Sequence, residues 1–249
     1  MKQTGLTLLF IAITIIALSQ NNSGIIIYKE VINTKPDMKQ AEEQGWAQWA
    51  DMVPDSVVFH KKMVFNATAS SYTNIKIEED PNEQNFVKKM MMRYANSDNQ
   101  TYINAETRDF VEQQDFMGKT FLIKGKPEEM KWKITGEMKV IMSYPCMKAT
   151  FEDSTGVIEA WFTTELPLNI GPEKYRGLPG AILELSTPRD QRPKVLTAVE
   201  IELKEVSEDE LIEPTEGKEV TREEYYKIVR KKVKEMRENG GFGGHGKRR

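Results

Sequence analysis

The sequence predicts a mostly β protein with one antiparallel, strongly curved sheet or half-barrel. A short helix in the N-terminal half and a C-terminal helix are expected beside the sheet. Three observations lead to this fold class. Short runs of alternating apolar and polar residues follow one another along most of the chain. Polar turn segments separate these runs, and no long helical pattern lies between them. The chain has 249 residues, which is enough for one large β domain with its own core.

The first 19 residues are typical of a secretory signal peptide. Lys2 gives a short positive region, residues 6–18 are apolar, and Ala17-Leu18-Ser19 fits a cleavage site of small residues. The apolar run is short for a membrane span, and polar residues follow it. We therefore expect residues 1–19 to be a signal peptide, the mature protein to be exported to the periplasm or cell envelope, and no transmembrane segment after cleavage.

Charge and cysteine content narrow the function further. The formal net charge is −3, so the chain as a whole has no attraction for nucleic acid, which is not expected as a partner. Cys146 is the one cysteine of the chain, so an internal disulfide cannot form. We expect Cys146 to be a small buried residue, and intermolecular pairing or a reactive thiol is the alternative.

The β domain is expected to span residues 20–212, with a helical insertion near 37–53. Residues 25–32 are rich in β-branched side chains and predict the first strand. Asp37 is a predicted N-cap for the insertion, which carries Trp46 and Trp49. Together with Trp132 and Trp161, these two tryptophans are the residues expected to line a groove on the sheet, with simple packing as the alternative.

Period-two patterns predict the remaining strands. On the strand that follows Ser56, one predicted face holds Val57, Phe59, Lys61, Met63 and Phe65. The other predicted strands are 74–77, 86–95, 101–104, 108–116, 119–124, 131–142, 146–151, 157–163, 181–186 and 194–206. Strand 131–142 has the cleanest alternation, which predicts one face in the core and one in solvent.

Residues 171–186, GPEKYRGLPGAILELS, are the most sharply specified stretch of the chain. Pro179 and Gly180 predict a type II turn over residues 178–181, with Gly180 at positive φ. An alternating run follows, with Ala181, Leu183 and Leu185 expected on one face. We interpret seven residues as a structural turn and strand: Gly171, Pro172, Gly177, Leu178, Pro179, Gly180 and Ile182.

The C-terminal part changes character after residue 212. Residues 213–239 are predicted to be a linker and an amphipathic helix, because Thr221 and Glu224 form a capping box. The predicted apolar stripe of this helix is Tyr226, Val229, Val233 and Met236, opposite a basic face. Residues 240–249 are glycine and basic residues with nothing to bury, so a mobile tail is expected.

The search for catalytic and metal motifs is negative, so no cofactor, metal or catalytic residue is expected. The chain has two histidines, His60 and His245, and none of the common hydrolase or nucleotide-binding motifs. Two remote alternatives remain. One is an enzyme that uses Cys146 with His60. The other is copper(I) binding by methionines with His245, although on a strand Met90 and Met92 would point away from Met91.

Four ordered blocks resemble the GLPGLI family of exported Bacteroidetes proteins. They are WKITGE at 132–137, YPCMKAT at 144–150, AWFTTELP at 160–167 and GPEKYRGLPG at 171–180. Ala181 departs from the family motif, which has a leucine there. The resemblance implies export and a shared β-rich fold. It implies no reaction, because the family has no established activity, cofactor or catalytic residue. The chain also resembles, more faintly, other exported β proteins with an I-x-x-Y-x-C-x-K/A block, and this implies a lipoprotein-carrier-like half-barrel.

The leading hypothesis is a non-enzymatic envelope protein that binds an apolar or amphipathic ligand, or a peptide, on its curved sheet. The alternative is an interaction or assembly module, which docks on another envelope protein through the basic C-terminal helix and tail.

Overall fold

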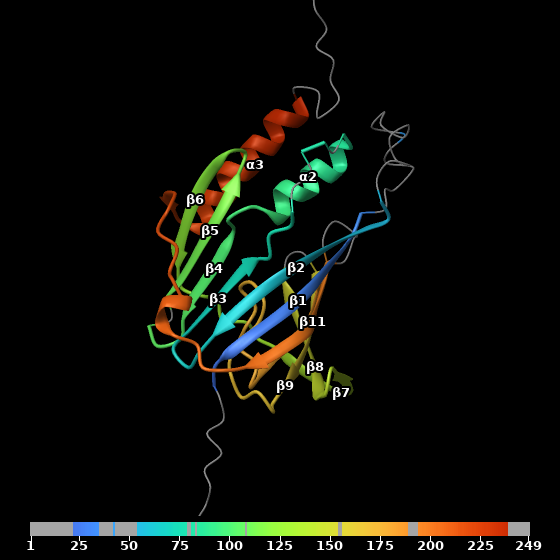
Figure 1. Ribbon diagram of the computed structural model, residues 1–249, viewed down its shortest axis with the longest axis vertical. Coiled ribbons are helices and arrows are strands. Elements are labelled where there is room, and N and C mark those ends of the chain that lie inside the picture. The colour runs from blue at the N-terminus through green and yellow to red at the C-terminus, as the bar shows by residue number, and fades with distance from the viewer. Residues whose placement is uncertain are drawn as a thin grey trace, which may run out of the picture.

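The computed structural model describes most of the chain between residues 22 and 238 (Figure 1). The described residues are 22–34, 42, 54–78, 81–82, 84–107, 109–153, 156–188 and 194–238. Residues 1–19, the tail at 240–249 and nearly all of the insertion near 37–53, with Trp46 and Trp49, lie outside them. Among the described residues, no helix has the length and apolar character needed to cross a membrane.

Twelve strands of the described residues form one sheet, in the order β12-β6-β5-β4-β3-β2-β1-β11-β10-β9-β8-β7. The first six strands are β1 (Gly24–Asn33), β2 (Ser56–Phe65), β3 (Ala69–Asn74), β4 (Gln100–Asn104), β5 (Phe110–Phe116) and β6 (Lys119–Gly125). The others are β7 (Lys133–Ile141), β8 (Tyr144–Asp153), β9 (Gly156–Thr163), β10 (Ala181–Thr187), β11 (Lys194–Leu203) and β12 (Lys218–Val220). Two helices, α2 (Phe86–Ala95) and α3 (Arg222–Glu238), and a 3-10 turn, η2 (Glu208–Glu210), complete the described elements.

The sheet is mostly antiparallel, which confirms the predicted fold class, but it is neither closed nor strongly curled. Only the β12–β6 pair is parallel among the strand pairs of the described residues. A barrel needs its two edge strands to meet, and here β7 and β12 lie at opposite ends of the sheet. The predicted strongly curved sheet or half-barrel is therefore wrong.

Cross-strand register defines one continuous face of the sheet, which we call face A. Directly opposed residues of neighbouring strands share a face. The register pairs Tyr28 with Lys61, Lys61 with Asn74, Tyr72 with Thr101, Thr101 with Glu112, Glu112 with Ile123, and Ile123 with Val220. Face A therefore runs from β1 to β12. On the other side of β1 it continues to β8, because the register pairs Tyr28 with Ala198, Leu196 with Leu185, Leu185 with Ala160, and Ala160 with Ala149. The face carries both core residues and polar residues.

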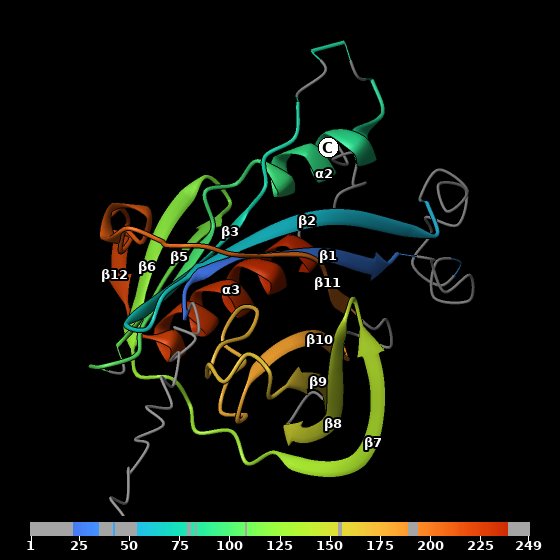
Figure 2. The same ribbon diagram turned by 60° about the horizontal axis from the view of Figure 1, so that its bottom comes forward.

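Face A is covered in two separate places (Figure 2). Residues 164–180, which we call the 164–180 loop, bury Leu166, Ile170 and Leu178 in the main core, against strands β8 to β11. At the other end, α3 packs Tyr225 and Ile228 against the cluster of Phe121, Ile123 and Val220. Between these two covers, residues of β2 to β5 line a pocket.

At the start of α3 the predicted capping box is present, whereas the predicted apolar stripe differs from the face that packs on the sheet. The Thr221 N–H donates to Glu224 Oε2 at 2.8 Å, and the Glu224 N–H donates to Thr221 Oγ1 at 3.2 Å, so the predicted capping box is present. Tyr225 and Ile228 are half-buried and pack against the sheet, and Val229 and Val233 of the predicted stripe are half-buried too. Tyr226, predicted to be in the apolar stripe, is 45% exposed.

Residues 86–95 form helix α2, and the predicted strand there is wrong. The run is rich in Lys, Met, Arg and Ala, which favour helices. Asn85 caps it by accepting a hydrogen bond from the Lys88 N–H at 3.2 Å. Met91, Tyr94 and Ala95 lie on one helical face and pack in a cluster with Phe59 of β2. The argument that Met90 and Met92 point away from Met91 assumed a strand, so it does not apply to this helix.

Two strands differ from their predictions for local reasons. β3 begins at Ala69, before the predicted 74–77, because Asn66 Oδ1 accepts the Thr68 and Ala69 N–H groups at 2.9 and 2.8 Å and fixes the turn. β7 is an edge strand, and its register with β8 is interrupted between Ile134 and Met138. Because only β8 flanks it, Ile134, Met138 and Val140 are 52%, 68% and 69% exposed, so the predicted core face is wrong.

The two glycines of the GLPG segment have different roles from those predicted. Gly177, not Gly180, takes positive φ, at 98°. Gly180 is required for space, because a Cβ there would lie 1.9 Å from the Thr163 carbonyl oxygen. The following strand, β10, has a register irregularity between Ile182 and Glu184, so Ala181, Ile182, Leu183 and Leu185 are all fully buried instead of alternating.

We expect Gly180→Ala to destabilise the protein by an amount near the top of the roughly 1–3 kcal/mol range for overpacking. The new methyl group must push the 164–180 loop away from β9, since its nearest neighbour is backbone. Gly125→Ala is the matched control, because a Cβ there meets nothing within 4 Å. It should change stability by less than about 1 kcal/mol. Urea denaturation measures both, and equal midpoints would contradict this role of Gly180.

Candidate functional site: a polar pocket on face A

A pocket of about 430 Å³ lies on face A between the 164–180 loop and α3. Its floor comes from β2 to β5, and its walls come from the 164–180 loop, the first turns of α3 and the residues around the ends of β8, β10 and β11. Lys61, Tyr72, Thr101, Glu112, Glu173, Tyr175, Lys194, Arg222 and Tyr226 are among the lining residues. Segments far apart in the chain therefore meet at one hydrophilic hollow, which we call the polar pocket.

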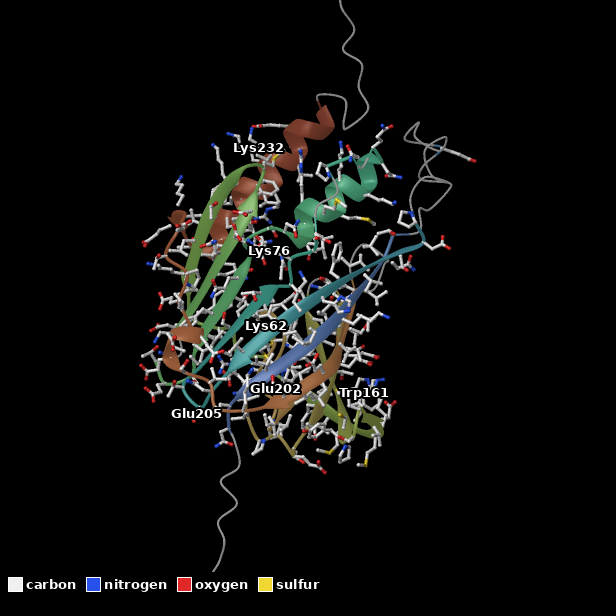
Figure 3. The ribbon with its side chains drawn as sticks, in the orientation of Figure 1. Lys62, Lys76, Trp161, Glu202, Glu205 and Lys232 are labelled. Carbon is white, nitrogen blue, oxygen red and sulfur yellow. The ribbon has the colours of Figure 1, made fainter. Side chains whose placement is uncertain are left out.

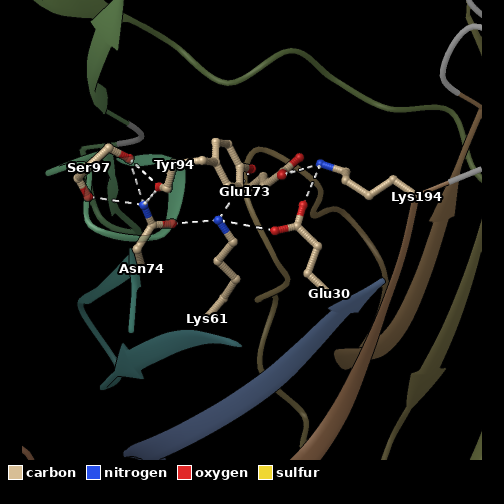
Figure 4. Close-up of polar contacts among 7 residues, drawn as sticks. All are labelled: Glu30, Lys61, Asn74, Tyr94, Ser97, Glu173 and Lys194. Atoms are coloured by element: carbon tan, nitrogen blue, oxygen red, sulfur yellow. Dashed lines mark hydrogen bonds and ion pairs between the residues drawn. The ribbon is translucent and has the colours of Figure 1, made fainter. Parts of the chain in front are cut away.

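Glu30 of β1 is a fully buried carboxylate beside two lysines that line the pocket, Lys61 and Lys194 (Figure 4). Its Oε2 is 3.1 Å from Lys61 Nζ of β2, and its Oε1 is 3.8 Å from Lys194 Nζ of β11. Beyond these two lysines, neither carboxylate oxygen has a polar partner among the described residues. Burying a charge without a counter-charge raises the free energy of the folded state. The two lysines supply that counter-charge to Glu30.

Lys61 is held from several directions. It donates a hydrogen bond to Asn74 Oδ1, and its ammonium lies 4.5 Å from the centre of the Tyr94 ring. Asn74 is itself fixed, because its Nδ2 donates to the carbonyl oxygens of Tyr94 and Ser97 at 3.0 Å. Burial lowers the pKa of Lys61, and the Glu30 carboxylate opposes this shift. The ammonium is therefore a fixed group of the floor.

Glu173 brings the 164–180 loop into the same network. Its carboxylate pairs with Lys194, which also faces Glu30. The backbone of Glu173 is left-handed, with φ of 56°, a conformation that is uncommon for a residue with a side chain. The loop is further anchored by Trp132, whose Nε1 donates to the Arg176 carbonyl at 2.8 Å. The network therefore links β1, β2, β11 and the loop.

A second ion pair forms the wall toward α3. Arg222, the first residue of α3, has its Nη2 3.3 Å from Glu112 Oε2 of β5, and its guanidinium lies 4.6 Å from the centre of the Phe110 ring. Gln114 Nε2 donates to Glu112 Oε1 at 2.7 Å. Burial raises the pKa of the Glu112 carboxyl, while Arg222 and Gln114 act in the opposite direction. The helix is thus tied electrostatically to the floor.

Tyr72 of β3 is a lining residue whose hydroxyl is buried and has no hydrogen-bond partner among the described residues. The side chain packs edge-on against Tyr28, with ring centres 6.2 Å apart. Burial raises the pKa of Tyr72, with the carboxylates of Glu173 and Glu30 adding to the shift, so the phenol is neutral. Buried polar groups normally have a partner, so the Tyr72 hydroxyl is an exception beside the pocket.

The side chains of the pocket can donate and accept hydrogen bonds, and the charged ones among them form ion pairs. Among the described residues, no group of three or more His, Cys, Asp or Glu side chains is placed to hold a metal ion. Cys146 is fully buried on β8, and burial raises its pKa to about 11. His60 is an exposed residue of β2, and β1, β11, β10 and β9 separate the two strands. The Cys146–His60 pair is therefore not assembled.

The seven residues interpreted from the sequence as a structural turn and strand do not line the pocket. Leu178 and Ile182 are buried in the main core, and Gly171 allows close approach of the Tyr175 carbonyl and Ile182. Of the four residues between Pro172 and Gly177, three line the pocket: Glu173, Lys174 and Tyr175. The motif therefore acts as a structural frame that presents these three side chains.

The described tryptophans lie away from the polar pocket. Trp132 holds the 164–180 loop and packs against Phe151. Trp161 lies under Lys139, whose Nζ is 4.3 Å from the centre of its ring, at the end of the molecule opposite Lys232 of α3 (Figure 3). With Trp46 and Trp49 outside the described residues, a groove lined by all four tryptophans stays a prediction.

Sequence reasoning missed the charged residues that build the site, although it contained their signal. Lys61 falls on the predicted strand face that otherwise holds Val57, Phe59, Met63 and Phe65. Glu30 falls, by the same period of two, on the face of Ile26 and Tyr28. A charge on an apolar face predicts a buried ionic group. Nothing in the sequence indicates that these two positions are neighbours.

Comparisons with known proteins identify a family segment and a fold. Residues 152–184 match the model of a family described as "Protein of unknown function (Porph_ging)". This family corresponds to the GLPGLI family, so the resemblance stated from the motif blocks is confirmed over this segment. A search of curated proteins finds no match.

Two solved structures share the fold. They are structures of PNGF-II in the C2 and P21 space groups, with TM-scores of 0.54 and 0.53 and 16% sequence identity. Each match covers 84% of this chain and 33% of the other chain. The chain thus spans about a third of the length of PNGF-II, and at this identity the likeness concerns the fold alone.

We expect Lys61→Met to lower the free energy of unfolding by roughly 3–5 kcal/mol, because it leaves Glu30 buried with Lys194 as its remaining counter-charge. Adding Glu30→Gln in a double variant removes the uncompensated charge and should recover most of the loss. Lys62→Met, on the opposite face of β2, is the control and should change stability by less than about 0.5 kcal/mol. Urea denaturation measures all three, and a double variant no more stable than Lys61→Met would contradict this account.

Proposed function

We propose that the protein is an exported, non-enzymatic binding protein that holds a small hydrophilic molecule in the polar pocket. One observation carries the proposal: the pocket is lined by polar side chains, and one of them, Tyr72, has a buried hydroxyl without a partner among the described residues. Its volume of about 430 Å³ lies within the roughly 300–1,000 Å³ typical of small-molecule sites. Export rests on the signal-like residues 1–19.

This occupant differs in polarity from the apolar or amphipathic ligand that the sequence suggests. The apolar side chains of face A around β8 to β11 pack under the 164–180 loop, where they form the main core. The hollow that remains next to them is lined by charged, amide, hydroxyl and phenol groups. A hydrophilic ligand can replace the water contacts of these groups, whereas an apolar ligand would leave them unpaired.

Docking on another envelope protein through α3 is the second candidate. It is favoured by the exposure of Lys227, Arg230 and Lys231, while the same helix packs against the sheet through Tyr225 and Ile228. This surface is separate from the polar pocket, so the two functions are compatible and can be tested in one measurement.

Native mass spectrometry of protein purified from the cells that make it should show a bound small molecule. Gln114→Trp should abolish this adduct, because the indole fills the pocket from its floor on β5. Lys62→Trp places the same side chain on the opposite face of the sheet and should retain it. An adduct that survives Gln114→Trp, or the absence of any adduct, contradicts the proposal. A bound protein that persists in both variants supports docking through α3.

A further inference from the structure

The cations that line the polar pocket are already paired with carboxylates of the protein. Each of the four has a carboxylate oxygen within 4 Å, and a charged ligand would have to displace one partner or add an unbalanced charge. The pairs are Lys61–Glu30 at 3.1 Å, Arg222–Glu112 at 3.3 Å, Lys174–Glu128 at 3.7 Å and Lys194–Glu173. The lining cations are therefore already paired before an anionic ligand arrives, and two of the three lining carboxylates, Glu112 and Glu173, belong to these same pairs.

The neutral groups of the lining are rich in hydroxyls. Thr101 of β4 and Thr187 of β10 are buried lining residues, and Tyr72 lies beside Thr101 in the register of face A. The Tyr72 hydroxyl is both a donor and an acceptor, and it has no partner among the described residues. A ligand hydroxyl can give or accept the same bond, so a polyhydroxylated molecule fits this set.

Aromatic rings supply the remaining contact surface. Tyr226 of α3 lines the pocket and is 45% exposed, and Tyr175 of the 164–180 loop lines it from another wall. An aromatic ring presents an apolar face together with a polar hydroxyl. A sugar ring has the matching character, with C–H groups on its faces and hydroxyls around its edge.

From these three observations we infer that the ligand is a neutral saccharide, held by hydrogen bonds to the floor at Tyr72 and by contact with the phenol rings of the walls. This inference rests on the proposed function and specifies its ligand class. The paired charges orient the neutral donors and acceptors and exclude charged relatives of the same sugar, because a carboxylate or ammonium on the ligand would face an already balanced site.

Pairs of sugars that differ at one substituent, neutral in one member and charged in the other, test the inference on the full mature chain. Glucose, galactose and N-acetylglucosamine are the neutral probes, and glucuronate, galacturonate and glucosamine are their charged counterparts. Saturation-transfer NMR followed by titration calorimetry should show binding of at least one neutral sugar, with its charged counterpart weaker. A charged sugar that binds more tightly than its neutral relative overturns the inference.

Tyr72→Phe should stabilise the free protein and weaken its binding of the sugar. Removing a buried hydroxyl without a partner should raise the urea midpoint of the free protein, and removing a ligand contact should weaken sugar binding roughly five- to tenfold. Tyr102→Phe, on the opposite face of β4, is the control and should leave binding unchanged. Unchanged sugar affinity in Tyr72→Phe contradicts the inferred contact.

Failure of the ligand class is distinguishable from failure of the binding function. If no sugar of the panel binds while native mass spectrometry shows an adduct that Gln114→Trp removes, the saccharide inference is wrong and the binding function stands. If no adduct is found either, both are wrong.

Discussion

The buried carboxylate of Glu30 is the constraint on which the rest of the site depends. It lies fully buried in β1, between Lys61 of β2 and Lys194 of β11. Since Lys194 also pairs with Glu173, the same charge network fixes the 164–180 loop over the sheet. An apolar core could hold these strands at least as well. The ionic network instead provides a polar base from which neutral donors and acceptors are presented.

The position of the pocket follows from how face A is covered. The loop after β9 covers one half of the face through its apolar side chains, and α3 covers the other through Tyr225 and Ile228. Arg222 and Glu112 tie the helix to the floor, and Glu173 and Lys194 tie the loop to it. Each cover is therefore fixed to the sheet by its own ion pair, and the pocket lies between the two covers.

Much of the fold was predictable because strands and caps leave local patterns. Alternation located most strands, and the Thr221 capping box located the start of α3. The failures have physical causes. Residues 86–95 are apolar enough to suggest a strand, yet their tertiary contacts with Phe59 and the Asn85 cap select a helix. The prediction of a strongly curved sheet was wrong, because sheet curvature depends on how strands distant in the sequence pack together. The pocket could not be predicted, since it joins Glu30, Lys61 and Glu173 from distant parts of the chain.

The central claim, that the buried ionic network fixes the 164–180 loop over face A, is tested most directly by amide hydrogen exchange in two lysine variants. Lys194→Met removes the bridge between Glu30 and Glu173. Lys204→Met removes an exposed ion pair with Glu202 and is the control. The account predicts faster exchange around residues 173–177 in Lys194→Met only, because the loop loses its anchor to β11. Unchanged protection of this loop in Lys194→Met would contradict it.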